Sequence, residues 1–283
     1  MTILVFGKTG QVATELGRLG GVRLLGRADA DLSDPDACRR AILTARPRAV
    51  INAAAYTAVD RAEADEEEVT RVNHLSPGAM ARSCAELDIP FVHISTDYVF
   101  SGEGSAPWKP ADPANPKGAY GRSKQAGEDA VRAAGGCHAI LRTSWVFSAH
   151  GGNFVKTMLR LSETRDQLSV VSDQIGGPTP AKAIASACLS IAEQLMEDPA
   201  KSGTYHFSGA PDVSWHDFAR AIFKHAKRAI DLAPIPTSDY PTPAARPLNS
   251  RLDCGTTDTA FAIKRPDWEA ALKDVLAELE PRK

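Results

Sequence analysis

The chain has 283 residues, of which 43% are hydrophobic and 24% charged, and its formal net charge is −2. This is the composition of an ordinary globular protein with a substantial core. The balanced charge, with no run of Lys or Arg, argues against nucleic acid and against a membrane surface as partners. Five widely spaced cysteines favour reduced thiols over a disulfide framework or a zinc site, and no apolar stretch is long enough to span a bilayer. A cytoplasmic enzyme that acts on a small molecule fits these limits.

Short apolar segments alternate with helical patterns through the first half of the chain. The expected strands are residues 3–6, 22–25, 49–51, 91–94 and 139–141, and the expected helices are residues 11–19, 36–45, 62–87 and 117–134. The third helix is expected to break around Ser76-Pro77-Gly78. Buried strands that alternate with helices are typical of a parallel sheet covered on both faces. The sequence therefore predicts an α/β fold with a Rossmann-type doubly wound parallel sheet.

The second half of the chain is richer in proline and glycine, which predicts a smaller and more irregular α/β lobe that binds the substrate. A helix over residues 183–197 and a strand over residues 204–207 are expected to return to the first lobe. The predicted domains are therefore interleaved. Residues 1–148 plus about 181–208 form the dinucleotide-binding domain, and residues 149–180 plus 209–283 form the substrate domain.

A glycine-rich turn follows the first expected strand and precedes a helix. It reads Gly7-Lys8-Thr9-Gly10-Gln11-Val12-Ala13, a Gly-x-x-Gly-x-x-Ala pattern. Glycines at such a junction let the backbone approach a pyrophosphate, which the free N–H groups of the helix start then stabilise. The alternative is an ordinary glycine turn, but its placement between strand and helix favours a dinucleotide site.

Two further segments fit the same cofactor. An acidic residue about 20 positions after the first glycine usually binds the ribose of NAD, whereas an arginine accommodates the phosphate of NADP. Arg27 occupies that position and favours NADPH, while nearby acidic residues keep NADH open, and Asp31 with Leu32 are expected beside the adenine ring. After the third strand, the small residues Ala53, Ala54 and Ala55 would let a cofactor lie close to the backbone.

Tyr120 and Lys124 lie four residues apart on an expected helix, so both side chains share one face. An ammonium near a phenol stabilises the phenolate, so we expect Lys124 to lower the pKa of Tyr120 and make it a ready proton donor. Thr96 follows the fourth strand, at the sheet edge where ligands bind, and its hydroxyl can donate a hydrogen bond to a carbonyl. The three residues form the predicted catalytic group, although a Tyr-x-x-x-Lys pair also occurs by chance on solvated helices.

Four motifs follow one another along the chain in this order: the glycine turn, the Asn-Ala-Ala-Ala segment 52–55, the Ser-Thr-Asp-Tyr-Val-Phe segment 95–100 and Tyr-x-x-x-Lys. On these four motifs the chain resembles an extended short-chain dehydrogenase/reductase. Segments 57–60, 142–147, 153–160 and 245–250 extend the resemblance over nearly the full length, toward members that act on dTDP-sugars. The resemblance implies reduction of the C4 ketone of dTDP-4-dehydro-β-L-rhamnose to dTDP-β-L-rhamnose by NADPH or NADH. The resemblance also implies that Tyr120 and Lys124 bind the cofactor.

The same resemblance implies roles for residues around the sugar. Asp97 and Trp145 are expected to contact it, and the segment containing Asn153 and Lys156 is expected to form part of the substrate wall. Arg246 is expected near the nucleotide diphosphate, with a solvated loop arginine as the alternative. For Asp97 and Trp145 the alternatives are a turn cap and ordinary core packing.

The resemblance also suggests a metal ion and a dimer, but the residues of this chain match that suggestion only in part. Some relatives hold Mg²⁺ with glutamates at a dimer interface, and Glu15 matches one such position, but Lys182 stands where another glutamate is expected. An ammonium is no ligand for a metal that prefers oxygen, so we predict no metal. Mg²⁺ with Glu15 as a ligand stays the alternative, and a homodimer stays open.

Two other functions remain as alternatives on the same scaffold. Dehydratases place a glutamate after the strand-end aspartate, where this chain has Tyr98, which favours reduction over a dehydratase or epimerase activity. The second alternative is a non-catalytic regulatory subunit, and it is disfavoured because Thr96, Tyr120 and Lys124 are all present.

Overall fold

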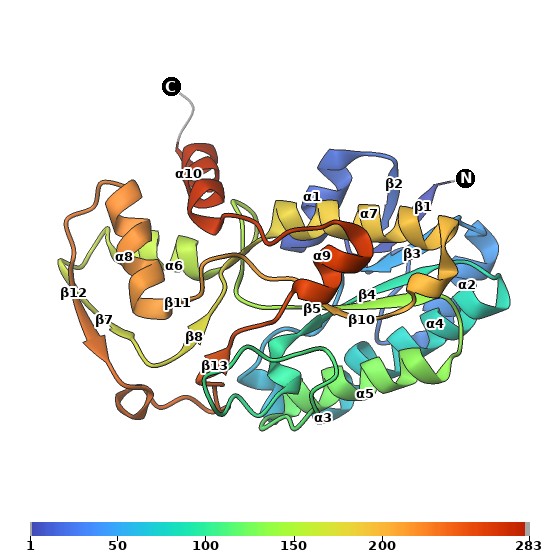
Figure 1. The fold of residues 1–283 in the computed structure, drawn as a ribbon, viewed down its shortest axis with the longest axis horizontal. Coiled ribbons are helices and arrows are strands. Elements are labelled where there is room, and N and C mark those ends of the chain that lie inside the picture. The colour runs from blue at the N-terminus through green and yellow to red at the C-terminus, as the bar shows by residue number, and fades with distance from the viewer. Residues whose placement is uncertain (1, 281–283) are drawn as a thin grey trace.

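The computed structural model describes residues 2–280, and its centre is a six-stranded parallel sheet (Figure 1). The strand order is β10-β5-β4-β3-β1-β2, and every neighbouring pair runs parallel. The strands are β1 (Ile3–Phe6), β2 (Val22–Leu25), β3 (Ala49–Asn52), β4 (Phe91–Thr96), β5 (His138–Thr143) and β10 (Gly203–His206). The strand order changes direction at β1, so the predicted doubly wound α/β sheet is confirmed.

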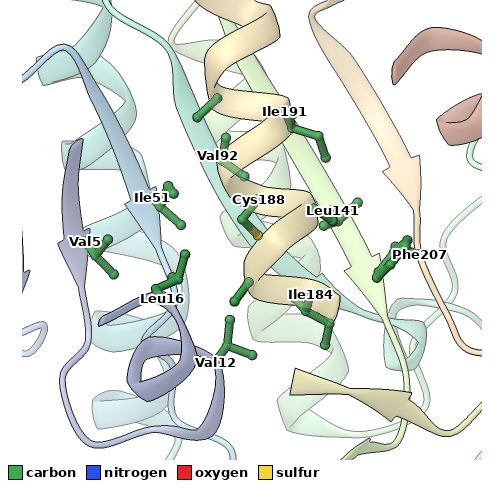
Figure 2. Close-up of a cluster of buried hydrophobic side chains, with 14 of the residues drawn as sticks. Val5, Val12, Leu16, Ile51, Val92, Leu141, Ile184, Cys188, Ile191 and Phe207 are labelled. Atoms are coloured by element: carbon green, nitrogen blue, oxygen red, sulfur yellow. The ribbon is translucent and has the colours of Figure 1, made fainter. Parts of the chain in front are cut away.

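Helices cover both faces of this sheet. One face carries α1 (Gln11–Leu19), α7 (Ala181–Glu197) and α9 (Gly255–Phe261), and the other carries α2 (Pro35–Ala45), α4 (Ser76–Glu86) and α5 (Ala119–Ala133). Figure 2 shows the first face, where Cys188 of α7 lies over Val92 and Leu141 of the central strands. Side chains alternate between the two faces along each strand, so Ile3 and Val5 face α1 and α7 whereas Leu4 and Phe6 face α2 and α4.

The helical segment before α4 differs from the prediction. No break occurs at Ser76-Pro77-Gly78. Instead a short helix α3 (Glu66–Thr70) continues through a π-helical turn (Arg71–Leu75) directly into α4, after a 3₁₀ turn at Arg61–Glu63. Pro77 lies in the first turn of α4, where its missing N–H is tolerated.

This arrangement brings α5 close to the π-helical turn. A Cβ atom on Gly127 of α5 would lie only 2.1 Å from the carbonyl oxygen of Asn73, so the two helical segments touch backbone to backbone. The side chain of Asn73 is fully used, because it bonds the backbone of Tyr56 and the hydroxyl of Ser123 on α5. The position of α5 in the fold is therefore fixed tightly, and α5 carries Tyr120 and Lys124.

A second, smaller group of elements lies beyond the carboxyl ends of the sheet (Figure 1). Its helices α6, α8 and α10 enclose their own apolar core together with β7. These elements are α6 (Phe154–Leu161), α8 (Trp215–His225), α10 (Trp268–Leu279), the pair β7 (Gln167–Val171) and β12 (Asp231–Ile235), the trio β11 (Val213–Ser214), β8 (Ile175–Gly176) and β13 (Asn249–Ser250), and the pair β6 (Val146–Phe147) and β9 (Thr179–Pro180). Short 3₁₀ turns lie at Asp97–Val99, Pro199–Lys201 and Thr237–Asp239. The domain boundaries stay a prediction.

Candidate active site

A cleft of about 970 Å³ opens at the carboxyl ends of the parallel strands, between the sheet and the smaller group of elements. This is the edge at which ligands bind in open α/β sheets. It is lined by most of the residues predicted from the sequence, namely Gly7, Lys8, Thr9, Gly10, Gln11, Val12, Arg27, Asp31, Leu32, Ala53, Ala54, Ala55, Thr96, Asp97, Tyr120, Lys124 and Trp145. The structure thus gathers into one cleft the predicted cofactor and catalytic residues and part of the predicted substrate set.

The glycine turn forms one end of the cleft. Gly7 has a φ of +117°, and a Cβ atom there would lie 3.1 Å from the Cβ of Ala13 and 3.4 Å from the carbonyl carbon of Ala53. Only glycine adopts this conformation without strain. Gly10 precedes the first turn of α1, which contains no acidic residue. The N-terminus of α1 therefore offers unopposed backbone N–H groups to an anion at this end.

Charged side chains flank the cleft after β2. The side chain of Arg27 is 80% exposed and its Nε lies 3.7 Å from a carboxylate oxygen of Asp31. Asp31 also accepts a hydrogen bond from the backbone N–H of Ser33, which fixes the turn before α2. An exposed guanidinium at this edge is free to reorient toward an added phosphate.

The predicted catalytic residues come from β4 and α5. Thr96 ends β4, where its hydroxyl donates to Asp97 Oδ1 at 3.1 Å and accepts from the backbone N–H of Tyr98 at 3.2 Å. Tyr120 and Lys124 lie one turn apart on α5 and are both buried. The start of α5 is held by Glu63, whose carboxylate accepts from the backbone N–H of Ala119 at 2.8 Å.

The expected lowering of the Tyr120 pKa by Lys124 is wrong for this structure. Burial raises the pKa of the Tyr120 phenol above its ordinary value, and only the hydroxyl of Thr96 beside it opposes that shift. The Lys124 amine instead lies 2.8 Å from the carbonyl oxygen of Ile94 and 3.2 Å from a ring nitrogen of His93. Tyr120 therefore keeps its proton at neutral pH, which is the form that a proton donor needs.

Asp97 lies buried in the cleft wall, and its Oδ2 atom has no hydrogen-bond partner among residues 2–280. Burial raises the pKa of this carboxyl to about 6, against the opposing effect of the nearby Ser250 and Thr96 hydroxyls, although the Ser250 hydroxyl makes no hydrogen bond with Oδ2 in this structure. An unpartnered buried oxygen is costly and is a ready acceptor for a hydroxyl group. Asp97 therefore places an unsatisfied polar atom just beneath the surface of the cleft wall.

Two stacked tryptophans form the opposite side of the cleft. Trp145 and Trp215 have ring centroids 3.7 Å apart with planes inclined by 13°. Trp145 has a φ of +48°, in the left-handed region that non-glycine residues seldom adopt. Sequence reasoning found Trp145 but missed Trp215, the first residue of α8. The only sequence indication was a large aromatic directly after the helix cap Ser214.

Three predicted substrate residues do not line the cleft. Asn153 caps α6 and its amide nitrogen donates to Gln11 Oε1 at 2.9 Å and to backbone carbonyls, so its side chain is fully used. Lys156 donates to the carbonyl of Ala149. Arg246 pairs with Asp60 at 2.7 Å. Each of the three contacts a neighbouring loop in this structure, and their roles toward the substrate stay predictions.

Glu15 lies away from the cleft in a cluster with His150 and Glu278, whose ligand atoms are all within 4.8 Å of one another. The Oε1 atom of Glu15 lies 3.0 Å from His150 Nε2, and the guanidinium of Arg18 lies 2.6 Å from Glu278 and 3.7 Å from Glu15. Mg²⁺ prefers six oxygen ligands in near-octahedral geometry. This cluster offers a ring nitrogen and already contains the positive charge of Arg18, so its residues do not fit the metal.

Comparison with known proteins identifies the family. The model of the RmlD substrate binding domain family matches residues 1–280. The dTDP-4-dehydrorhamnose reductase of Escherichia coli strain K12 is 40% identical over 99% of this chain and 98% of its own length. The chain belongs to the dTDP-4-dehydrorhamnose reductase family.

Solved structures of this family agree with the fold described above. The reductase of Clostridium acetobutylicum superposes with a TM-score of 0.92 at 33% identity, covering 99% of this chain and 100% of that one. The reductase of Bacillus anthracis, solved in complex with NADP, gives a TM-score of 0.91 at 30% identity, covering 98% and 100%. Within residues 2–280, no helix is both long and apolar enough to cross a membrane.

Proposed function

We propose that the protein reduces the C4 ketone of dTDP-4-dehydro-β-L-rhamnose to the alcohol of dTDP-β-L-rhamnose, the last step of dTDP-L-rhamnose biosynthesis, with NADPH or NADH. The observation that supports this best is the single cleft that joins the glycine turn to Thr96, Tyr120 and Lys124 in a member of this reductase family. The five cysteines are unpaired, which fits the reducing cytoplasm as the site of the reaction.

The residues of the cleft fit a nicotinamide cofactor. The close approach at Gly7 and the N-terminus of α1 suit a pyrophosphate, and Ala53 to Ala55 leave room beside the backbone. When bound, the cofactor supplies the hydride. We propose that Arg27 favours NADPH by donating hydrogen bonds to the ribose phosphate, whereas Asp31 and Leu32 lie beside the adenine.

The protein supplies the proton and the orientation of the ketone. Tyr120, protonated at neutral pH, donates its proton to the alkoxide that forms at C4. The hydroxyl of Thr96 turns its hydrogen from Asp97 Oδ1 to the same substrate oxygen when the sugar binds. General acid catalysis of this kind contributes about 10² to 10⁴ in rate, and one well-placed donor contributes about 3 to 4 kcal/mol. We assign sugar contacts to Asp97 and Trp145, which both line the cleft.

A specific observation disfavours dehydration. Elimination of water needs an acid and base pair beside the sugar, and the position after Asp97 is Tyr98, whose ring packs edge-on against Tyr120 at 5.6 Å between centroids. Burial raises the pKa of the Tyr98 phenol, so it does not act as a base near neutral pH. At the position where dehydratases have a carboxylate, this chain therefore has a phenol ring that packs against Tyr120.

The experiment that tests the proposal mixes purified protein, NADPH and dTDP-4-dehydrorhamnose and follows NADPH absorbance. We expect substrate-dependent oxidation, and we expect Tyr120→Phe to lower kcat by about 10² to 10⁴ while NADPH still binds. Cofactor binding without oxidation by the wild type would contradict the proposal and favour a non-catalytic role.

A further inference from the structure

A chain of buried polar side chains lies behind Lys124 and reaches back to the edge of the cleft. It runs from Asn52 at the end of β3, through His93 in β4, to Lys124 of α5, and all three residues are at most 1% exposed. Asn52 Nδ2 lies 3.2 Å from His93 Nδ1, and His93 Nε2 lies 3.2 Å from Lys124 Nζ. The site described above includes Lys124 among its predicted catalytic and cofactor-binding residues but gives no role to His93.

The positions of the hydrogen atoms along this row of polar side chains follow from one fixed donor. The backbone N–H of Ala54 lies 3.2 Å from Asn52 Oδ1, and a backbone N–H can only donate. The amide of Asn52 is thereby oriented so that its NH₂ group donates to His93 Nδ1. A neutral imidazole carries one hydrogen, so the hydrogen then sits on Nε2 and points at the amine of Lys124.

An ammonium at Lys124 conflicts with this arrangement, because two donors would face each other. Nζ already donates to the carbonyl of Ile94 at 2.8 Å. A charged Lys124 is accommodated only when His93 moves its hydrogen to Nδ1 and gives up the hydrogen bond from Asn52. A neutral Lys124 accepts from Nε2–H and keeps the whole chain satisfied. The tautomer of His93 and the charge of Lys124 are therefore coupled.

The surroundings keep the His93 imidazole neutral and lower the pKa of the Lys124 amine toward neutral pH. Burial, with a smaller effect from Lys124, lowers the pKa of His93 well below its ordinary value. Burial lowers the pKa of Lys124 to about 8, opposed only by Glu128 one turn further along α5. Glu128 is itself paired with the guanidinium of Arg142 at 2.6 Å, and the phenol of Tyr120 is protonated.

We propose that His93 is a positioning residue that holds the Lys124 amine and shifts its protonation equilibrium toward the neutral form through the tautomer that Asn52 favours. The inference rests on the proposed reductase function. The ammonium form of Lys124 has the hydrogens that would hold the bound cofactor, and Tyr120 regains its proton from solvent after each turnover. When Lys124 loses its proton to solvent, its neutral amine accepts a hydrogen bond from His93 Nε2–H, and the ring reaches this form by losing the Nδ1 proton to water and taking one from water at Nε2. His93 thus stabilises the neutral form of Lys124 relative to the ammonium that the reaction uses.

The first test compares pH profiles of kcat for the wild type, His93→Gln and His206→Gln. The wild-type rate should fall as the pH rises through about 8, because the Lys124 ammonium is present below its pKa and lost above it. In His93→Gln the amide oxygen can face the ammonium at no cost, so we expect this alkaline limb to move up by about one pH unit. His206 is also a fully buried neutral imidazole, bonded to the carbonyl of Trp108, and its variant should keep the wild-type limb.

The second test reads the tautomer directly from the ring ¹⁵N shifts of His93 in the wild-type protein without substrate, assigned by their loss in His93→Gln. We expect Nδ1–H below the alkaline limb and Nε2–H above it. One tautomer throughout the range from pH 6 to pH 10, or an unmoved limb in His93→Gln, would overturn the proposal. A wild type that does not oxidise NADPH would refute the proposed function instead, and the spectrum would still decide the tautomer.

Discussion

Trp215 offers the sharpest test of how the substrate side of the cleft is built. Trp145, the proposed sugar contact, holds a left-handed backbone conformation that costs about 1 to 3 kcal/mol and persists only if its surroundings impose it. Two features impose it here: the ring of Trp215 at 3.7 Å and the hydrogen bond from Thr179 N–H to the Trp145 carbonyl at 3.1 Å. Replacing Trp215 should release the Trp145 ring while leaving the cofactor end intact.

The expected change in KM follows from the interaction energy of the stacked tryptophan pair. An aromatic pair contributes about 0.5 to 1.5 kcal/mol beyond its buried area, which corresponds to about a 2- to 13-fold change in an equilibrium constant. We therefore expect Trp215→Ala to raise KM for the sugar nucleotide by about that factor with KM for NADPH unchanged. Trp215→Phe keeps an aromatic ring and should show the smaller end of the range.

The assay pairs steady-state kinetics with circular dichroism. Two indoles stacked this closely give an exciton couplet, which should disappear in Trp215→Phe and in Trp145→Phe. The matched control is Trp108→Phe, because Trp108 also stacks on an aromatic, Phe100 at 4.7 Å, but does not line the cleft. Loss of the couplet with an unchanged KM for the sugar nucleotide would refute the role given to Trp145 and its stacking partner.

Three further predictions concern other parts of the site. Gly127→Ala should lower both the melting temperature and kcat, because the new Cβ would lie 2.1 Å from the carbonyl oxygen of Asn73 and would displace α5. Unchanged values in thermal melts and kinetics would contradict this close contact. Arg27→Ala should raise KM for NADPH but not for NADH, and equal effects would remove the reason for an NADPH preference. KM for the sugar nucleotide should rise below about pH 6, since the Asp97 carboxylate is present above its raised pKa and protonated below it, and Asp97→Asn should abolish this dependence.

The sheet and the cofactor end could be predicted from the sequence because their determinants are local. Buried strands, the spacing of helices and the glycine turn at Gly7 each follow from short patterns, and the fixed geometry of a parallel sheet then brings strand ends to one edge. Thr96 and Tyr120 were predicted to converge on the same basis, and the structure places both in the cleft.

The substrate end could not be predicted in the same way, because it is built from loops whose contacts are distant in sequence. Trp215 reaches the cleft because α8 packs in the core with α6 and α10, which places its first residue against Trp145. Arg246 is held by Asp60, which lies far from it in the sequence. The pKa of Tyr120 was predicted in the wrong direction because the sequence showed the nearby ammonium but not the depth of burial.

The central claim is that the protein transfers hydride to C4 of the sugar and releases the oxidised cofactor. It is tested most directly with NADPH deuterated at C4 of the nicotinamide and dTDP-4-dehydrorhamnose, with analysis of the sugar product by NMR. We predict one equivalent of NADPH consumed for each dTDP-rhamnose formed, with the label at C4 of the sugar. Sugar that changes without net oxidation of NADPH, or product without label at C4, would contradict the account.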